Sequence, residues 1–271
     1  ARPIVNFLFL GDIVGRAGRN IIIEKLESIK QQYEIDFVIA NGENSAGGYG
    51  ITEEICNQLY EAGVDVITSG NHIWDQKETM NHIIKENRLL RPMNFQEGTP
   101  GRGFEVYEKN GFKVGVMNLM GNVYMKKCED VFPFIQEKIK KINLKKEIDF
   151  LAVDFHAEIT SEKQAMGHLL DGKATFVVGT HTHTPTLDFR ILEHGTAYQT
   201  DAGMCGDYNS VIGMNKENAI LKFFKRKTDR LIPVIKNPTI SGIKVIADDK
   251  TGLAKDIEPI MIGGNLKFSK N

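Results

Sequence analysis

The fold is decided by the stretch Ile4-Val5-Asn6-Phe7-Leu8-Phe9-Leu10-Gly11-Asp12, in which an apolar run leads through one glycine into a carboxylate. The run Ile4–Leu10 is short, rich in residues that favour strands and bounded by turn-forming residues, which is typical of a buried β-strand. Similar runs recur further along the chain at Asp36–Ala40, Val64–Thr68, Asp149–Phe155 and Thr175–Gly179. We therefore predict five buried strands, each followed by polar residues.

Segments with helical periodicity separate the first three of these strands. Apolar residues recur at helical spacing over Asn20–Gln32 and Glu53–Ala62. Thr52 stands where the N-cap of the second helix is needed, with acidic residues in the first turn. The order strand, helix, strand, helix, strand predicts a parallel sheet.

The rest of the chain adds a hairpin, two helices and more strands. Phe104–Glu108 and Phe112–Asn118 flank Asn110-Gly111, the strongest short signal for a β-hairpin. Helices are predicted over Phe132–Ile142 and Glu162–Leu170, the latter opened by a capping box from Ser161 and Gln164. Further strands are predicted at Leu187–Leu192, Thr196–Thr200, Ala219–Phe224, Ile243–Ala247 and Ile257–Ile262. These strands are enough for two sheets.

The composition is that of an ordinary globular protein of 271 residues, with 41% hydrophobic and 25% charged residues and no linker, which favours a single domain over residues 1–271. Lys+Arg 34 against Asp+Glu 35 gives a net charge of -1, which disfavours long duplex nucleic acid and anionic membrane surfaces as partners. The most apolar stretch near the start, Ile4–Leu10, is far too short to span a bilayer and lacks the flanks of a signal peptide. We therefore expect a soluble, unexported protein. Cys56, Cys128 and Cys205 are odd in number and form no CxxC pair, which favours a reducing cytoplasm.

Metal-ligand residue types follow each predicted buried strand. In open α/β sheets, ligands bind beyond the carboxyl ends of the strands, so these side chains are expected to converge. Each one alone is more often a turn former or a satisfied core residue, but five loops in register favour a shared site. His181 and His183 stand at i and i+2, which on an extended segment point the same way. The candidate ligands are Asp12, Glu43, Asn44, Asn71, His156, His181 and His183.

The donor set predicts the kind of site. Carboxylate, amide and imidazole groups without thiolate suit Mn, Fe, Zn or Ni better than calcium. Seven donors are too many for one tetrahedral ion and fit two ions that share a carboxylate and keep open positions. Two divalent ions beside Asp12 and Glu43 leave a formal charge of about +2, so an anionic phosphate ester is the expected guest.

Two glycine-rich segments are weaker candidates for phosphate binding. Gly11–Gly18 lacks the G-x-G-x-x-G spacing of a dinucleotide loop, and its Asp12 would repel a pyrophosphate. Gly47-Gly48-Tyr49-Gly50 lacks the Lys-Ser/Thr of a P-loop and is interpreted as a flexible rim beside Glu43 and Asn44.

Five motif blocks carry a family resemblance. Gly11-Asp12, Gly42-Glu43-Asn44, Gly70-Asn71-His72, Phe155-His156-Ala157-Glu158 and Gly179-Thr180-His181-Thr182-His183 resemble, in order and spacing, those of the calcineurin-like metallophosphoesterases. More narrowly they resemble the YmdB-like branch, described as cyclic-nucleotide phosphodiesterases. Asn118–Gly121 and Thr200–Met204 also resemble that branch, so the resemblance covers nearly the whole chain. It implies an α/β fold of two packed mixed β-sheets flanked by helices, a four-layer α-β-β-α sandwich.

The resemblance also implies roles for the site residues. Asp12, Asn44 and His183 would bind one metal ion, Asn71, His156 and His181 the other, and Glu43 both. Iron or manganese is expected first, with zinc or nickel as alternatives. His72 would contact the substrate phosphate and protonate the leaving oxygen; the alternative is a structural histidine that caps the next helix.

The chain departs from the broad superfamily at three positions. The first block lacks the histidine of Asp-x-His, and Asn44 is the expected replacement. Glu43 stands where the usual bridging residue is Asp. Ile73 stands where an acidic residue normally follows the Asn-His pair.

The predicted function is a dimetal phosphodiesterase for small cyclic nucleotides, 2′,3′-cyclic or 3′,5′-cyclic, in which a metal-bridging hydroxide attacks phosphorus. The alternatives are a phosphomonoesterase, such as a nucleotidase or protein phosphatase, and a regulatory nucleotide-binding protein with little turnover. A small phosphodiester is the expected partner, and a homo-oligomer is left open. His82, His168 and His194 are expected at the surface, outside the site.

Overall fold

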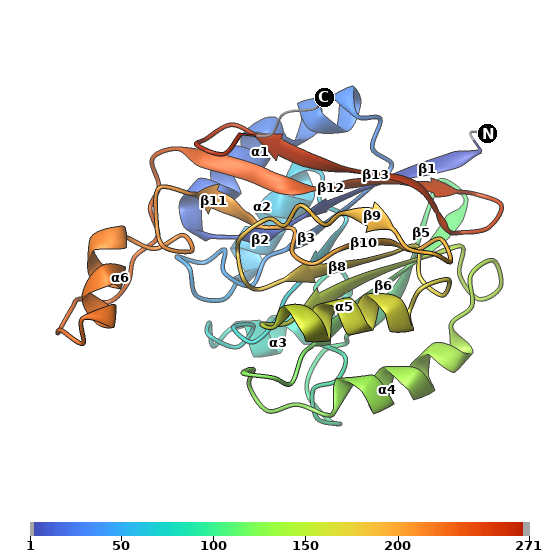
Figure 1. The fold of residues 1–271 in the computed structure, drawn as a ribbon, viewed down its shortest axis with the longest axis horizontal. Coiled ribbons are helices and arrows are strands. Elements are labelled where there is room, and N and C mark those ends of the chain that lie inside the picture. Colours follow the sequence, from blue (N-terminus) through green and yellow to red (C-terminus); the bar gives the residue numbers. More distant parts are fainter. Residues whose placement is uncertain (1–2, 268–271) are drawn as a thin grey trace.

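Two β-sheets packed face to face form the centre of the molecule (Figure 1), whose computed structural model describes residues 3–267. In the first sheet the strand order is β2-β11-β12-β1-β3-β4, with β13 paired to β12. Its strands are β1 (Ile4–Leu10), β2 (Asp12–Ile13), β3 (Phe37–Asn41), β4 (Val66–Thr68), β11 (Met204–Asp207), β12 (Pro238–Asp248) and β13 (Ala254–Ile262). The strands β1, β3 and β4 are parallel, as predicted, whereas β12 runs antiparallel to β1 and makes the sheet mixed.

The second sheet has the order β5-β6-β7-β8-β10-β9. Its strands are β5 (Phe104–Lys109), β6 (Phe112–Met120), β7 (Phe150–His156), β8 (Phe176–Thr180), β9 (Arg190–Ile191) and β10 (Ala197–Gln199). The predicted hairpin joins β5 to β6, and its turn residues Asn110 and Gly111 have φ of 52° and 84°. Positive φ at both positions is what a two-residue hairpin turn requires.

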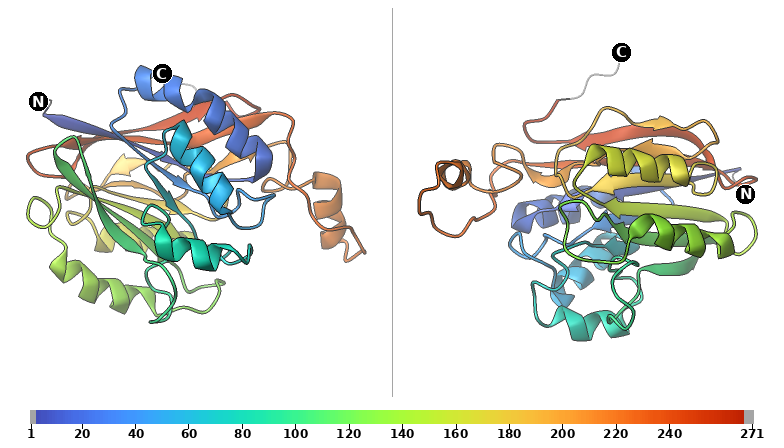
Figure 2. Two further views of the ribbon diagram at one scale, coloured as in Figure 1. Left: turned by 180° about the vertical axis from the view of Figure 1, so that it is seen from behind. Right: turned by 60° about the horizontal axis from the view of Figure 1, so that its bottom comes forward.

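Helices cover the outer faces of both sheets. Against the first sheet pack α1 (Gly15–Gln32) and α2 (Glu53–Ala62), which the left view of Figure 2 shows from outside. Against the second sheet pack α4 (Val131–Lys138), the 3-10 helix η1 (Ile139–Lys141) and α5 (Thr160–Leu169). Two further helices are α3 (Thr79–Lys85) and α6 (Lys216–Phe223), and α6 stands apart from the rest of the ribbon (Figure 1). The predicted α-β-β-α sandwich is confirmed.

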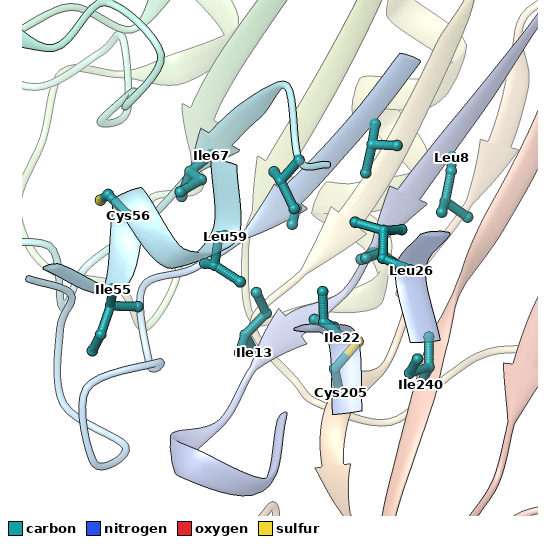
Figure 3. Close-up of a cluster of buried hydrophobic side chains, with 14 of the residues drawn as sticks. Leu8, Ile13, Ile22, Leu26, Ile55, Cys56, Leu59, Ile67, Cys205 and Ile240 are labelled. Atoms are coloured by element: carbon teal, nitrogen blue, oxygen red, sulfur yellow. The ribbon is translucent and has the colours of Figure 1, made fainter. Parts of the chain in front are cut away.

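The alternation of side chains along β1 separates two of the three hydrophobic clusters. Phe7 and Phe9 face the second sheet, where the ring centroids of Phe7 and Phe150 are 5.3 Å apart. Leu8 and Leu10 face the helices, and Figure 3 shows Leu8 beside the α1 residues of that cluster. Each fully buried side chain of this size contributes about 1.5–3 kcal/mol. The two faces of one strand therefore hold three layers together.

Several predicted elements were wrong in type or extent. Ala219–Phe224 is not a strand but lies mainly in α6, which Asn215 caps by accepting a hydrogen bond from the backbone N of Asn218. A short apolar run cannot by itself distinguish strand from helix, and no neighbouring strand pairs with this segment in the described chain. Of Leu187–Leu192, only Arg190–Ile191 forms a strand.

Helix starts also differ in two places. The capping box at Ser161 is absent, because α5 already begins at Thr160, whereas the Thr52 cap of α2 is confirmed by its hydrogen bond from Ile55 N. Helix α1 begins at Gly15, so the last residues of the segment Gly11–Gly18 form its first turn. Within residues 3–267, no helix combines the length and apolar character that crossing a membrane requires.

Candidate metal centre

The strand ends bring all seven predicted ligand residues together. Asp12 lies in β2, Glu43 and Asn44 follow β3, and Asn71 follows β4, all in the first sheet. From the second sheet, His156 is the last residue of β7, and His181 and His183 follow β8. The seven side chains are linked by contacts of 4.0 Å or less. Their role as metal ligands stays a prediction, but the convergence is as expected.

One cluster surrounds His156, which is fully buried. Its Nε2 lies 2.6 Å from Glu43 Oε1, 3.0 Å from Asn71 Oδ1 and 3.2 Å from His181 Nδ1. Glu43, His156 and His181 alone could hold an ion, because their donor atoms lie within 4.8 Å of one another. This cluster is the group that the resemblance assigns to one metal ion.

A second cluster surrounds His183. Its Nε2 lies 3.2 Å from Asn44 Nδ2 and 4.0 Å from Asp12 Oδ1. Glu43 connects the two clusters, since its Oε1 lies 3.5 Å from Asn44 Nδ2. The side chains thus fall into the two groups that a pair of ions sharing Glu43 needs.

Contacts on the outer nitrogen of each of the three imidazoles turn the other nitrogen toward the clusters. His156 Nδ1 lies 2.8 Å from Thr180 Oγ1, whose own hydrogen is donated to Asp154, so Nδ1 donates to Thr180 and Nε2 is the nitrogen that faces the cluster. His181 Nε2 lies 2.6 Å from Glu158 Oε2, and His183 Nδ1 lies 2.8 Å from the carbonyl of Ile212. Ligand histidines in metal sites are oriented in this way by a partner on the other nitrogen.

The result is a buried cluster of electron-pair donors that fits cations. Asp12 Oδ1 is buried and has no hydrogen-bond partner among the described residues, yet lies 3.9 Å from His156 Nδ1. His156 Nε2 and His181 Nδ1 face each other at 3.2 Å, where two lone pairs repel unless a proton or a cation lies between them. Buried acceptors without donors are costly, and metal ions resolve that cost.

The electrostatics of the cluster also favour positive charge. Burial acts to lower the pKa of His156, but the carboxylates of Glu43 and Asp12 raise it to about 9. Burial acts to raise the pKa of Glu43, but His156 and hydrogen bonds outweigh it and lower this pKa to about 2. Burial and the neighbouring His156 lower the pKa of His181 to about 3, which keeps that imidazole neutral. A metal ion would take the place of the proton on His156.

His72 lies beside Glu43 and does not cap a helix. Its backbone N donates to Glu43 Oε2 at 3.0 Å, and its Nδ1 lies 2.7 Å from Asp75 Oδ2. The next helix, α3, begins only at Thr79. The side chain is 34% exposed, so its Nε2 can meet a ligand from solvent. Asp75 thus places a carboxylate beside the His72 ring, two positions after Ile73.

The His181-Thr182-His183 segment is not extended, contrary to the i, i+2 prediction. His181 and His183 have φ of 102° and 68°, in the left-handed region that non-glycine residues rarely adopt. A buried ion pair holds this loop, because Asp201 Oδ2 accepts from Lys163 Nζ at 2.7 Å and from Thr182 Oγ1 at 2.6 Å. The loop conformation turns the two imidazoles toward different clusters.

Close packing explains the glycine of the third motif block. A Cβ built on Gly70 would lie 2.1 Å from the His156 ring, so a side chain there would displace the ring. The segment Gly47–Gly50, interpreted above as a flexible rim beside Glu43 and Asn44, has neighbours from elsewhere in the chain. Gly48 packs against Met214 and Pro233, so the segment is covered by the region around α6.

Sequence reasoning missed the residues that orient the predicted ligands. Glu158 and Asp201 stood inside quoted motif blocks, which was the available signal, whereas Asp75, Asp154 and Lys163 gave none. Asp154 accepts hydrogen bonds from Asn41 Nδ2, Thr68 Oγ1 and Thr180 Oγ1, and burial raises its pKa to about 6. Of the three histidines placed at the surface, His168 and His194 are exposed, but His82 is buried, 3.7 Å from Glu53.

Comparisons with known proteins agree with the motif resemblance. A 2′,3′-cyclic-nucleotide 2′-phosphodiesterase of Bacillus subtilis (strain 168) is 42% identical over 264 residues, which cover 97% of this chain and 99% of that one. The crystal structure of a phosphatase from Mycoplasma pneumoniae is 38% identical with a TM-score of 0.89, covering 96% of this chain and 94% of that one.

The fold extends to more distant enzymes. The NAD nucleotidase of Haemophilus influenzae has a TM-score of 0.59 at 10% identity, covering 96% of this chain and 56% of that one. At that identity the likeness concerns the fold alone. A family model described as YmdB-like protein matches residues 8–260. The chain therefore belongs to the YmdB-like protein family, as its motif blocks indicated.

Proposed function

We propose that this protein is a dimetal phosphodiesterase that hydrolyses cyclic nucleotides, with 2′,3′-cyclic nucleotides as the first candidates. The enzyme class is a metal-dependent phosphoric ester hydrolase, in line with close relatives that are a phosphodiesterase and a phosphatase. The use of two ions and the choice of nucleotide are the new parts of the proposal.

The observation that carries the proposal is the pair of clusters joined by Glu43. Asn71, His156 and His181 would hold one ion, and Asp12, Asn44 and His183 the other. When bound, two such ions withdraw charge from phosphoryl oxygens and lower the pKa of water, the two contributions that phosphodiester hydrolysis needs. Oxygen and imidazole donors without thiolate support iron or manganese ahead of softer metals.

The chain's own contribution to the chemistry is orientation and a proton. Asp75 fixes the His72 ring through Nδ1, which leaves Nε2 to contact a phosphoryl oxygen and to protonate the departing one. Thr180, Glu158 and the Ile212 carbonyl fix the three ligand imidazoles before substrate arrives. Preorganised groups of this kind need no rearrangement at the moment of reaction.

The preference for a 2′,3′-cyclic phosphate rests on the B. subtilis relative, which is described by that activity. In such a substrate, water adds to phosphorus, the bond from phosphorus to O2′ breaks, and O2′ takes a proton. The product is a 3′-phosphomonoester. A ribose alkoxide leaves poorly without that proton, which gives His72 its role.

Side-by-side turnover of 2′,3′-cyclic AMP, 3′,5′-cyclic AMP and AMP by protein loaded with manganese tests the proposal. We expect the 2′,3′-cyclic substrate to have the highest kcat/KM. Faster hydrolysis of AMP would favour a phosphomonoesterase, which the Mycoplasma phosphatase structure makes the second candidate. Tight binding of a cyclic nucleotide with negligible turnover would instead favour the regulatory alternative.

A further inference from the structure

The net charge of the chain hides a strong local separation. We define the arm as residues 209–237, which contain α6 and its two flanking segments. The arm carries seven Lys/Arg and two Asp/Glu, a formal charge of +5, which leaves -6 for the remaining residues of a chain whose total is -1. The arm therefore carries the positive charge that attracts a nucleic-acid backbone, although the chain as a whole does not.

The arm also exposes large apolar side chains between its charges. Phe223 and Phe224 are 86% and 69% exposed, and Ile220 is 49% exposed. Lys222 precedes the two phenylalanines, and Lys225, Arg226 and Lys227 follow them. Within α6 only Ala219 is buried, so the helix has almost no packing against the sandwich. Exposed apolar groups of this size normally mark a binding surface.

The base of the arm is fixed to the candidate metal centre. The carbonyl of Ile212 is the partner of His183 Nδ1 at 2.8 Å. In the segment that follows α6, the carbonyl of Leu231 accepts from Tyr49 Oη at 3.0 Å, and the Arg230 guanidinium lies 4.2 Å above the Tyr49 ring. From this base α6 projects away from the body, as both views of Figure 2 show.

Aromatic rings interleaved with cations are the features that bind single-stranded nucleic acid. The rings stack on unpaired bases, and the cations track the phosphates. The bases of a duplex are paired and stacked, so they cannot stack on these rings. The short helix α6 also offers little contact area to a long duplex. Positive charge on an arm whose base contacts the candidate metal centre points to a ligand whose phosphates continue from that centre along the arm.

We infer that the arm binds single-stranded RNA whose 3′ end carries a 2′,3′-cyclic phosphate, so that the terminal nucleotide enters the metal centre and preceding nucleotides lie on α6. This inference rests on the proposed function. DNA lacks the 2′-oxygen and cannot form this end group, which selects RNA. In the reaction, water adds to phosphorus, the bond to O2′ breaks, O2′ takes a proton, and the RNA is left with a 3′-phosphate.

Charge reversal in the arm tests the inference. We compare the native protein with the triple variant Lys225→Glu, Arg226→Glu, Lys227→Glu and with the double variant Phe223→Ser, Phe224→Ser. The matched control reverses the exposed Lys138, Lys140 and Lys141 at the end of α4 and in η1. The substrates are 2′,3′-cyclic AMP and an RNA of about ten nucleotides with a cyclic phosphate end, within the usual range of site sizes.

Both arm variants should lower kcat/KM for the RNA by about tenfold or more, while kcat/KM for 2′,3′-cyclic AMP stays within about twofold. The control variant should resemble the native protein on both substrates. Equal losses on the two substrates, or equal losses in the control, would overturn the inference. Unchanged RNA turnover in both arm variants would also overturn it. If sedimentation then shows that the arm joins two copies of the chain, a second copy and not RNA is the partner of the arm.

Direct binding separates this inference from the proposed function. Fluorescence anisotropy with a labelled RNA of the same length ending in 3′-phosphate should show the same arm dependence, with a Kd that rises steeply with salt. If cyclic AMP is not hydrolysed but this binding is lost in the arm variants, the proposed function fails and the RNA surface stands. If the native protein does not bind this RNA, the RNA surface fails alone.

Discussion

At the scale of single residues, the site depends most on Glu43, which contacts both clusters and also accepts from the backbone of His72. Glu43→Gln keeps the volume but replaces one acceptor oxygen by a donor and removes the charge. Metal affinity and turnover should fall together, by more than the roughly 10- to 100-fold that loss of a residue supporting a ligand typically costs. Elemental analysis and turnover of the purified variant measure both. Two ions per chain with normal turnover would rule out the bridging role.

Asn44 is the residue that stands in for the missing histidine of the first block. Its Nδ2 lies beside His183 and its contact with Glu43 is longer, so its loss should affect one ion more than the other. Asn44→Ala should therefore weaken one of two binding steps in a manganese titration. Asn44→His should restore that step with a changed metal preference. Equal weakening of both steps would contradict this assignment.

His72 is tested through the leaving group, because a general acid helps only when the departing oxygen needs a proton. His72→Ala should lower turnover of 2′,3′-cyclic AMP by about 10²–10⁴-fold. The loss on bis-p-nitrophenyl phosphate should be much smaller, since p-nitrophenolate leaves without a proton. Asp75→Asn should act in the same direction with a smaller loss. Metal content is measured alongside as the control.

A histidine that only binds phosphate would depress both substrates alike, because it would stabilise charge common to both transition states. Equal losses on cyclic AMP and the nitrophenyl ester would thus remove the acid role of His72 and leave the ligand assignment intact.

At the scale of elements, the loop after β8 is held in an unfavourable backbone conformation by the ion pair of Lys163 and Asp201. Asp201→Asn would leave the Lys163 ammonium buried and unpaired, which costs about 3–5 kcal/mol. The double variant Lys163→Met, Asp201→Asn removes that charge and should recover much of the stability. Denaturant unfolding measures the two free energies.

Metal affinity shows whether Asp201 positions the loop after β8 or only stabilises the fold together with Lys163. The double variant still lacks the carboxylate that accepts from Thr182 N and Thr182 Oγ1, so its loop should bind manganese more weakly than the native loop. Native metal affinity in the stable double variant would show that Asp201 serves stability alone.

The elements that could be predicted were those with strong local patterns. Buried parallel strands such as Ile4–Leu10 combine apolar runs with glycine boundaries, and the turn at Asn110-Gly111 has a single strong interpretation. The segment Ala219–Phe224 was mispredicted because burial decides between strand and helix for a short apolar run, and this segment is mostly exposed. Strands β2 and β11 pair with each other and are too short to give a periodic signal.

At the scale of the whole molecule, the candidate metal ligands could be predicted from the sequence, but the residues that orient them through hydrogen bonds and ion pairs could not. A ligand candidate needs only to follow a strand, which the sequence displays. Its support is a contact between distant segments, such as Asn41 with Asp154 across 113 positions or Lys163 with Asp201 across 38. Only the packing of the two sheets creates such pairs. The positive charge of the arm, by contrast, stands in one stretch of the sequence, although the total of -1 conceals it.

The site also spans both sheets, which couples metal binding to the stability of the whole fold. Asp12, Glu43, Asn44 and Asn71 come from the first sheet, whereas His156, His181 and His183 come from the second. An ion held between Glu43 and His156 therefore ties the two sheets together at one end of their common core. Without an ion, Asp12 Oδ1 is a buried acceptor with no hydrogen-bond partner among the described residues, and His156 Nε2 lies 3.2 Å from His181 Nδ1.

Removing metal should therefore lower the melting temperature as well as abolish turnover. At a free metal concentration of about 100 times Kd, each bound ion stabilises the folded state by about 2.7 kcal/mol, which corresponds to roughly 5–10 °C per ion for a chain of this size. Scanning calorimetry with and without chelator measures the shift, and added manganese should restore it. The matched control is Glu43→Gln, whose melting temperature should respond little to chelator because its two clusters no longer share a charge. Full activity in the chelated native protein, or a melting temperature that ignores metal, would contradict a dimetal centre between the sheets.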